Sequence, residues 1–244
     1  MVKILQRLEE MLGLKRLDRG TVKGYKFVST DMRSLDQNQT WEVDKWYMHD
    51  GKVSVGKGGF HASPDLYSAY ENSSEGERLF EVEARGIVRK YDQFAAREMK
   101  LVREIDPRLS IDYAINCAKH VLPMYEKISP GDLRPRKAIE AAEAYLGDPS
   151  EQNKSAAGSA GNAAWSAGNA AWYPAWSAGH AAGSAAYAAW SAESAENAAE
   201  SAENAAWSAE YASRFAIFII GSADKEKEWQ RKLLEGLIGK YYLK

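Results

Sequence analysis

The chain has 244 residues, of which 45% are hydrophobic and 27% are charged, and its formal net charge is -2. This balance predicts a soluble globular protein of one large or two modest domains, without overall attraction to nucleic acid or to an anionic membrane. Cys117 is the single cysteine, which excludes an intramolecular disulfide and a multi-thiolate metal site and is typical of the cytoplasm.

The first twenty residues, MVKILQRLEEMLGLKRLDRG, have apolar side chains at helical spacing with charges between them. They predict a short amphipathic helix, and they lack the continuous apolar core and cleavage site of a signal peptide. The apolar run FAIFIIG at 215–221 is too short to cross a bilayer, so we expect no membrane partner.

Residues 24–105 are rich in Val, Tyr, Phe and Trp, with turn residues between the apolar runs. This pattern predicts a small mixed β-sheet. RLFEVEARG at 78–86 alternates as a strand with one solvated face does, and Glu81 and Glu83 belong to that face. In SPDLYSAYEN we expect a short helix with Ser63 as its N-cap.

From residue 106 onward the sequence is typical of helices. Apolar residues recur at helical spacing in IDYAINCAKHVLPMYEK at 111–127 and in RPRKAIEAAEAYLG at 134–147. The predicted fold class is α+β, a small sheet domain followed by an all-helical, Ala-rich bundle with close helix packing. The predicted domains are 1–106, mixed α/β with the N-terminal helix, and 107–244, helical.

From residue 159 the chain repeats a seven-residue unit close to Ser-Ala-x-Asn-Ala-Ala-Trp. The period is helical, and the tryptophans favour folded helix over a disordered spacer. On a helical wheel the three alanines form one arc, while Trp and Asn lie on the opposite side. Pro174 divides the segment into two helices, which we expect to pack as antiparallel neighbours.

The two sides of this helix have different expected roles. Small side chains let helix backbones approach closely, whereas the tryptophans need another layer, a second copy or a partner protein to cover them. The stretch 165–213 has no lysine or arginine, and its later glutamates form either a solvated face or an acidic docking edge. The predicted partner face comprises Trp165, Trp172, Trp176, Trp190, Trp207, Glu196 and Glu203.

Three stretches of the helical half carry a resemblance to a known family. They are INCAKHVLPMYEKISPGDLRPRKAIEAAEAYL, AGHAA and KEKEWQRKLLEGLI. Over about residues 110–240 they resemble the immunity proteins of bacterial polymorphic toxin systems. The resemblance implies an all-helical protein that binds and neutralises another protein, without chemistry of its own and therefore without a cofactor.

The core Gly59-Phe60-His61-Ala62-Ser63 resembles, in turn, an uncharacterised domain of phage and bacterial proteins. The two resemblances in one chain indicate a phage or mobile-element accessory protein, acting in the bacterial host cytoplasm.

The same region also supports an enzymatic alternative. GKGGFHASPDLYSAYEN at 56–72 is similar to the segment of ADP-ribosyltransferases where a glycine-rich strand leads into a helix. That similarity implies an NAD pocket lined by Gly59, Phe60, His61, Ser63 and Tyr70, with Glu81 or Glu83 orienting the ribose. Against it, YKFVSTDM lacks the first-strand His or Arg of those enzymes, and a glycine-rich turn is also an ordinary hairpin.

The histidines share no ligand spacing, so we expect no metal site. The leading hypothesis is a non-enzymatic protein-binding factor, immunity-like or phage counter-defence. It would sequester or neutralise a toxin or a host defence protein through its helical surface. Homo-oligomerisation is the other way to cover the tryptophans.

Overall fold

The computed structural model describes residues 20–34, 39–72, 78–171, 176–193, 200–201, 204–205, 207–208 and 222–242. The expected N-terminal helix, the run at 215–221 and the Pro174 break lie outside these residues.

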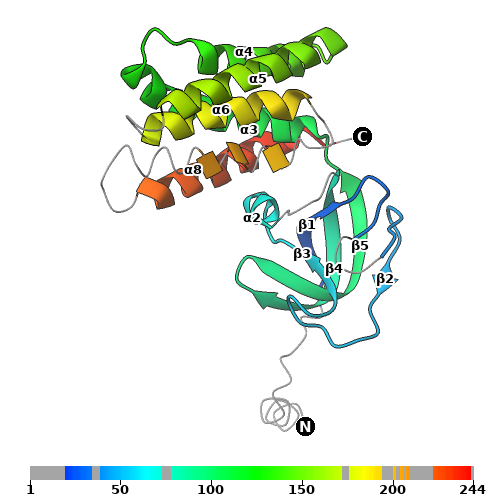
Figure 1. The fold of residues 1–244 in the computed structure, drawn as a ribbon. Coiled ribbons are helices and arrows are strands. Elements are labelled where there is room, and N and C mark those ends of the chain that lie inside the picture. Colours follow the sequence, from blue (N-terminus) through cyan, green and yellow to red (C-terminus); the bar gives the residue numbers. More distant parts are fainter. Residues whose placement is uncertain are drawn as a thin grey trace, which may run out of the picture.

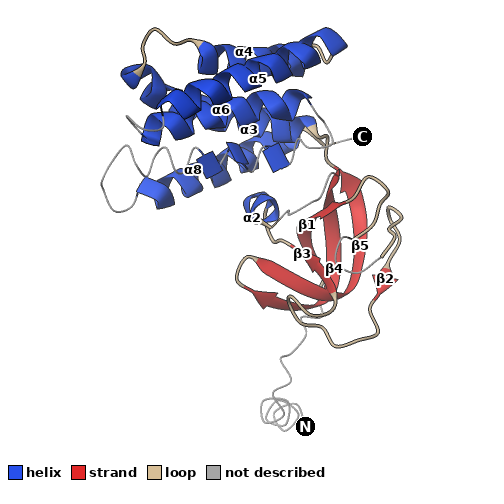
Figure 2. Cartoon of the chain, viewed as in Figure 1, coloured by secondary structure: helices blue, strands red, loops and turns tan. Residues whose placement is uncertain are grey.

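The segments rich in Val, Phe and Tyr form the strands of one sheet (Figure 2). Its strands are β1 (Val22–Val28), β2 (Tyr47–Met48), β3 (Phe60–Ala62), β4 (Arg78–Lys90) and β5 (Gln93–Glu104). They follow the order β1-β4-β5-β2, and β3 also pairs with β5. Pairings between these strands are antiparallel, and Val43 and Leu101 add an isolated parallel bridge. The α+β fold class is confirmed.

Strand β4 is covered on both faces, which differs from the expected solvated face. Phe80 and Val82 pack into the core of the sheet with Trp41. On the other face Leu79 joins the helical core, and Glu81 is only 4% exposed. The alternation was correctly predicted, but neighbouring strands and helices cover the face that it assigned to water.

The short helix α2 (Leu66–Glu71) begins later than the sequence suggested. Asp65, not Ser63, is its N-cap, and one carboxylate oxygen accepts a hydrogen bond from the Ser68 backbone N–H at 2.9 Å. Ser63 instead exchanges two backbone hydrogen bonds with Tyr25 of β1. Because Ser63 is still paired with the sheet, the chain cannot turn into a helix there.

The remaining helices lie side by side on one side of the molecule (Figure 1). They are α3 (Arg108–Ile128), α4 (Arg134–Gly147), α5 (Glu151–Ala171), α6 (Trp176–Glu193) and α8 (Ser222–Leu237), followed by the short 3-10 helix η1 (Ile238–Lys240). Helix α6 packs against α3, α4 and α5. In the described part of the chain, no helix combines the length and apolar character of a membrane span.

Small side chains allow α5 and α6 to pack closely as antiparallel neighbours. A Cβ atom on Gly161 would lie 2.6 Å from the Trp190 indole nitrogen and 3.2 Å from the Ala186 carbonyl oxygen. Four residues further along α5, Trp165 contacts Tyr187, which precedes Trp190 by almost one turn of α6. The buried Ser184 hydroxyl of α6 donates a hydrogen bond to the Ala205 carbonyl at 2.8 Å, which attaches the next Ala-rich segment.

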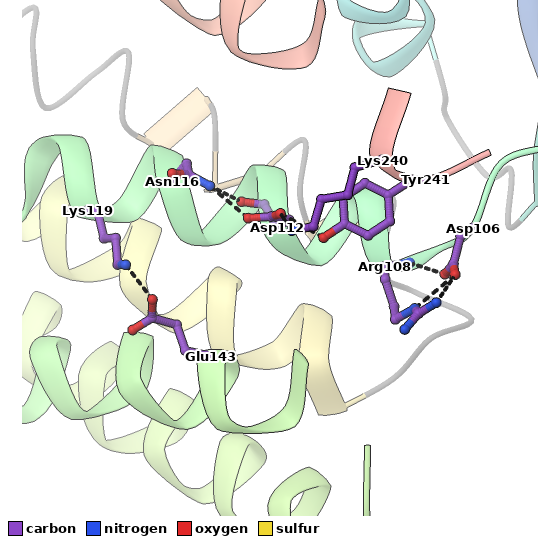
Figure 3. A network of polar contacts seen from close by, with 8 residues as sticks. All are labelled: Asp106, Arg108, Asp112, Asn116, Lys119, Glu143, Lys240 and Tyr241. Atoms are coloured by element: carbon purple, nitrogen blue, oxygen red, sulfur yellow. Dashed lines mark hydrogen bonds and ion pairs between the residues drawn. The ribbon is translucent and has the colours of Figure 1, made fainter. Parts of the chain in front are cut away.

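The end of the described chain returns to the junction between the sheet and the helices. Tyr242 forms a bridge with Ile105, next to the end of β5. Figure 3 shows Asp112 of α3 beside Lys240 and Tyr241. The Asp112 carboxylate accepts hydrogen bonds from the Lys240 ammonium at 2.8 Å and from the Tyr241 hydroxyl at 2.7 Å. These contacts join the last helical turn to the start of α3.

Candidate functional site

The repeat places alanines in the core and large rings at the surface, as the helical wheel predicts. Trp165 and Trp207 each occupy the seventh position of a unit, and they are 40% and 51% exposed. An exposed indole leaves a large apolar area in water, so two of them at one place indicate a surface that another group covers. Many alanines at the second, fifth and sixth positions are fully buried, namely Ala164, Ala167, Ala182, Ala185, Ala188, Ala189 and Ala205, whereas Ala170 at a fifth position is exposed.

Three rings from α5 and α6 form one cluster. The ring centroid of Trp165 lies 5.7 Å from that of Tyr187 and 5.6 Å from that of Trp190. Tyr187 and Trp190 meet edge to face at 5.3 Å. Aromatic pairs at such distances and tilts attract one another and fix each other's orientation. The Trp165 ring is therefore held in place on its inner side while its outer side is exposed.

A hollow with a volume of about 70 Å³ lies beside this cluster. It is formed where α5, α6 and residues 207–208 meet. Its wall includes both exposed tryptophans, and the full set of lining residues is Trp165, Gly168, Asn169, His180, Gly183, Tyr187, Trp207 and Ser208. We call this cavity the aromatic hollow.

The aromatic hollow is weakly polar and carries no formal charge of its own. His180 is buried, and burial lowers the pKa of its imidazole, which favours the neutral form. The His180 and Trp207 rings meet edge to face with centroids 5.8 Å apart. Burial also raises the pKa of Tyr187, and the nearby Glu200 carboxylate raises it further. Glu200 therefore places negative charge near one wall.

Of the predicted partner face, the structure brings together Trp165, Trp190 and Trp207 around the aromatic hollow and its supporting cluster. Trp190 is half-buried against the core and supports the Trp165 ring. Trp176 is the first residue of α6, and its side chain is outside the described part of the structure. The predicted residues Trp172, Glu196 and Glu203 also lie outside the described residues.

Sequence reasoning missed His180, Gly183 and Tyr187 as parts of this surface. A signal was present, because each departs from the repeat unit. His180 and Tyr187 stand at the fourth position, where Asn is usual, and Gly183 stands at the seventh position, where Trp165 and Trp207 occur in other units. Departures from a regular repeat mark the positions where the surface is not uniform.

The two aromatic residues of the predicted NAD pocket are buried in two different cores. Phe60 packs in the sheet core, where its ring meets Trp41 edge to face at 5.0 Å. Tyr70 lies in the helical core, and its hydroxyl is 2.8 Å from the Ser110 hydroxyl. Because both rings are almost fully buried, neither offers an accessible face on which a nicotinamide could stack.

The remaining polar members of that set also have structural partners. The His61 Nε2 atom accepts a hydrogen bond from the Gly56 N–H at 2.9 Å, and Ser63 is paired with β1. The backbone of Gly59 has a φ of 93°, and a Cβ there would lie 2.9 Å from the Ala96 carbonyl oxygen. Glycine is needed at that position because of this close approach.

Both candidate carboxylates of β4 form ion pairs. Lys23 and Arg103 donate hydrogen bonds to Glu81 at 2.9 and 3.0 Å. Burial alone would raise the pKa of Glu81, but these two bonds hold it below its usual value. Glu83 lies 3.4 Å from the Lys100 ammonium. Within the described ranges, no three His, Cys, Asp or Glu side chains come together as metal ligands.

Two family models match this chain. Residues 100–237, which contain the aromatic hollow, match a family described as "Imm-5 like putative immunity protein". Residues 22–111 match a domain of unknown function, DUF7666, and Gly59, Phe60 and His61 lie within that range. Searches of curated proteins and of solved structures found no match.

Proposed function

Since this chain belongs to the Imm-5 like immunity protein family, we propose that it is a non-enzymatic binding protein that neutralises a protein toxin through the aromatic hollow. The observation that carries this proposal is the pair of exposed indoles, Trp165 and Trp207, on the wall of one cavity. Tryptophan is enriched among the few residues that dominate the binding energy of protein interfaces.

The size of the hollow supports a protein partner over a small molecule. Its volume is about 70 Å³. Sites for drug-sized ligands and cofactors usually have roughly 300–1,000 Å³. The hollow therefore suits one side chain of a larger surface, and the exposed faces of Trp165 and Trp207 extend the contact around it.

The wider setting belongs to the same proposal. The partner is a toxin, or a host defence protein if the chain acts for a phage as an accessory factor. Residues 22–111 match a domain of unknown function, which does not distinguish a toxin from a host defence protein. The same capture experiment tests both partners. We place the protein in the bacterial cytoplasm, and we propose self-association through the same face in the absence of a partner.

Affinity capture from the source bacterium tests the proposal. The bait is the wild-type chain or a Trp165→Ala/Trp207→Ala variant, with Tyr91→Ala as control because Tyr91 is the most exposed large hydrophobic residue in the described structure and lies at the β4–β5 turn. We expect the wild type and the control to retain one protein that the double variant loses. That protein, expressed alone, should reduce colony counts, and co-expression of the wild-type chain should restore them.

A captured protein that binds the double variant with unchanged affinity would remove the aromatic hollow from the mechanism. A captured protein that is not toxic would contradict the immunity role. Mass measurement of the purified chain tests self-association separately, because a monomer in the absence of partner would exclude it.

The transferase alternative has weaker support, because Phe60 and Tyr70 are buried and Glu81 is held in two ion pairs. Calorimetric titration with NAD tests it directly. We expect no binding heat for the wild type. Saturable heat that a Glu81→Ala/Glu83→Ala variant loses would favour the enzyme.

A further inference from the structure

The aromatic hollow lies where a unit of the repeat has glycine in place of the ring that closes other units. Trp165, Trp190 and Trp207 close their units at the seventh position, but Gly183 stands at that position in the unit SAGHAAG. A Cβ on Gly183 would have only ordinary contacts, with the Ser208 hydroxyl at 3.8 Å and the Trp165 ring at 3.9 Å. The space beside Gly183 could hold a larger side chain, and it is therefore available to a side chain of a partner protein.

The walls of this space are suited to a cation. The rings of Trp165, Tyr187 and Trp207 line it, and the face of an aromatic ring attracts a positive charge within about 6 Å. A guanidinium group is flat and weakly hydrated, and it stacks on aromatic faces better than an ammonium group does. A neutral apolar side chain would gain contacts here but no electrostatic attraction.

The charges around the hollow favour the same occupant. The chain has no lysine or arginine from residue 155 to residue 213, so the stretch that forms the hollow carries neither of the cations that could compete for it. Glu200 lies near enough to Tyr187 to raise the pKa of its hydroxyl, although burial is the larger cause. Burial lowers the pKa of the His180 imidazole and so favours its neutral form, which does not repel a cation.

From these observations, and resting on the proposed function, we propose that the aromatic hollow binds one arginine side chain of the protein partner. The guanidinium group would lie between the Trp165 and Trp207 rings in the space left by Gly183, with Glu200 near the Tyr187 wall. Arginine would then be the residue of the partner whose loss weakens the complex most.

The test uses the purified full-length chain without any partner. The probes are N-acetyl-arginine amide and its neutral isostere N-acetyl-citrulline amide, at millimolar concentrations. The readout is the nuclear magnetic resonance shift of the indole N–H signals of Trp165 and Trp207, each assigned by its Trp→Phe variant. We expect saturable shifts with the arginine amide. The citrulline amide should bind at least about threefold more weakly than the arginine amide, because it lacks the free energy of an exposed cation–π contact.

Two variants locate the binding. Gly183→Trp should abolish the arginine shifts by filling the hollow, and Gly183→Leu replaces it if circular dichroism shows that the larger ring prevents folding. Gly236→Trp is the matched control, because Gly236 of α8 has open space around its Cβ position and should leave the shifts unchanged. Glu200→Gln should weaken the binding of the arginine amide and leave that of the citrulline amide unchanged.

Equal binding of arginine and citrulline amides, or arginine shifts that persist in the filled variant, would overturn the proposal. So would the absence of any shift. These outcomes are separate from the proposed function, since capture of a toxin can succeed with another residue in the hollow. Conversely, if arginine binds but no toxin is captured, the immunity role would be refuted, whereas the arginine site in the aromatic hollow would stand.

Discussion

The sheet and the Ala-rich helices solve the same packing problem in opposite ways. The sheet core is built from large side chains, such as Phe80, Phe94 and Met99, which interdigitate between strands. The helical core around α6 is built largely from alanines, so the helix backbones themselves come close together. When small residues fill the core, the large rings of the repeat remain for the surface, and there they form the aromatic hollow.

This difference separates the stability of the two parts from their functions. In the sheet, aromatic residues such as Phe60 and Trp41 are buried and serve packing. In the helical half, Trp165 and Trp207 are exposed although they belong to the same class of residue. Aromatic content alone therefore does not indicate a binding surface, and the face on which the ring lies decides its role.

The largest effect should come from removing a large side chain of the sheet core. Phe80 is fully buried, so Phe80→Ala should lower the free energy of unfolding by about 3–5 kcal/mol through lost contacts and a residual cavity. Urea denaturation followed by circular dichroism measures this loss. Tyr91→Ala, at a 91% exposed position, should stay within about 0.5 kcal/mol of the wild type. A small loss for Phe80→Ala would mean that the sheet core is loosely packed.

The helical core should lose stability when a small side chain is made larger, which is the opposite of the change in the sheet. Ala189 is fully buried in α6, so Ala189→Leu should force the helices apart and cost about 1–3 kcal/mol. Ala156→Leu on the exposed side of α5 adds the same atoms where there is space and should be nearly neutral. The same denaturation experiment compares the two. Equal stability of both variants would contradict close packing through alanine.

Replacing a glycine by alanine should change the stability of the protein in opposite directions at Gly161 of α5 and Gly183 of α6. Gly183→Ala places a methyl group in ordinary van der Waals contact with Ser208 and Trp165 and removes the helix cost of glycine, so it should stabilise the protein by up to about 1 kcal/mol. Gly161→Ala gains the same helix propensity, but its Cβ would lie 2.6 Å from the Trp190 ring, so the net effect should be destabilising. Thermal melting ranks the two variants, and the reverse order would place the close helix contact elsewhere.

The smallest effects concern two histidines with opposite pH dependence. The hydrogen bond with Glu226 raises the pKa of His120, so His120 stabilises the fold below about pH 6.5 and this stability is lost as pH rises through the raised pKa. Burial lowers the pKa of His180, so stability falls as pH drops below about 6.5, where the unfolded chain takes up the proton.

Denaturation between pH 5 and pH 8 checks both signs. His120→Gln should remove the decline on the alkaline side, by less than about 1 kcal/mol because the His120 side chain is 40% exposed to solvent. His180→Gln should remove the decline on the acidic side. Identical profiles for the two variants would show that neither histidine titrates as its surroundings imply.

Local patterns of sequence predicted most of the helical half. The apolar stripe of α3 and the alanine face of the repeat follow from side-chain spacing, and the limits of α4 follow from Pro135 in its first turn and Gly147 at its end. Both kinds of signal are local properties of the sequence. The aromatic hollow could not be predicted in the same way, because it depends on how Trp165, Gly183 and Trp207 are aligned across three segments. Periodicity places a residue on a face, but not opposite a given neighbour.

The sheet shows the same limit. Alternation correctly placed Glu81 opposite Phe80 and Val82, yet the burial of Glu81 depends on Lys23 and Arg103, which come from the two strands beside β4. Ser63 has the sequence features of an N-cap, but its pairing with Tyr25 determines where α2 begins. In both cases a contact between residues distant in sequence overrides the local preference.

The affinity of the captured partner for two variants, each with one glycine replaced by tryptophan, tests the central claim most directly. Gly183→Trp fills the aromatic hollow, whereas Gly236→Trp adds the same ring to an open position of α8. If the hollow is the binding contact, the first variant should raise the dissociation constant about thirtyfold or more, as loss of a dominant interface residue does, and the second should leave it unchanged. Equal dissociation constants for wild type, Gly183→Trp and Gly236→Trp would contradict it.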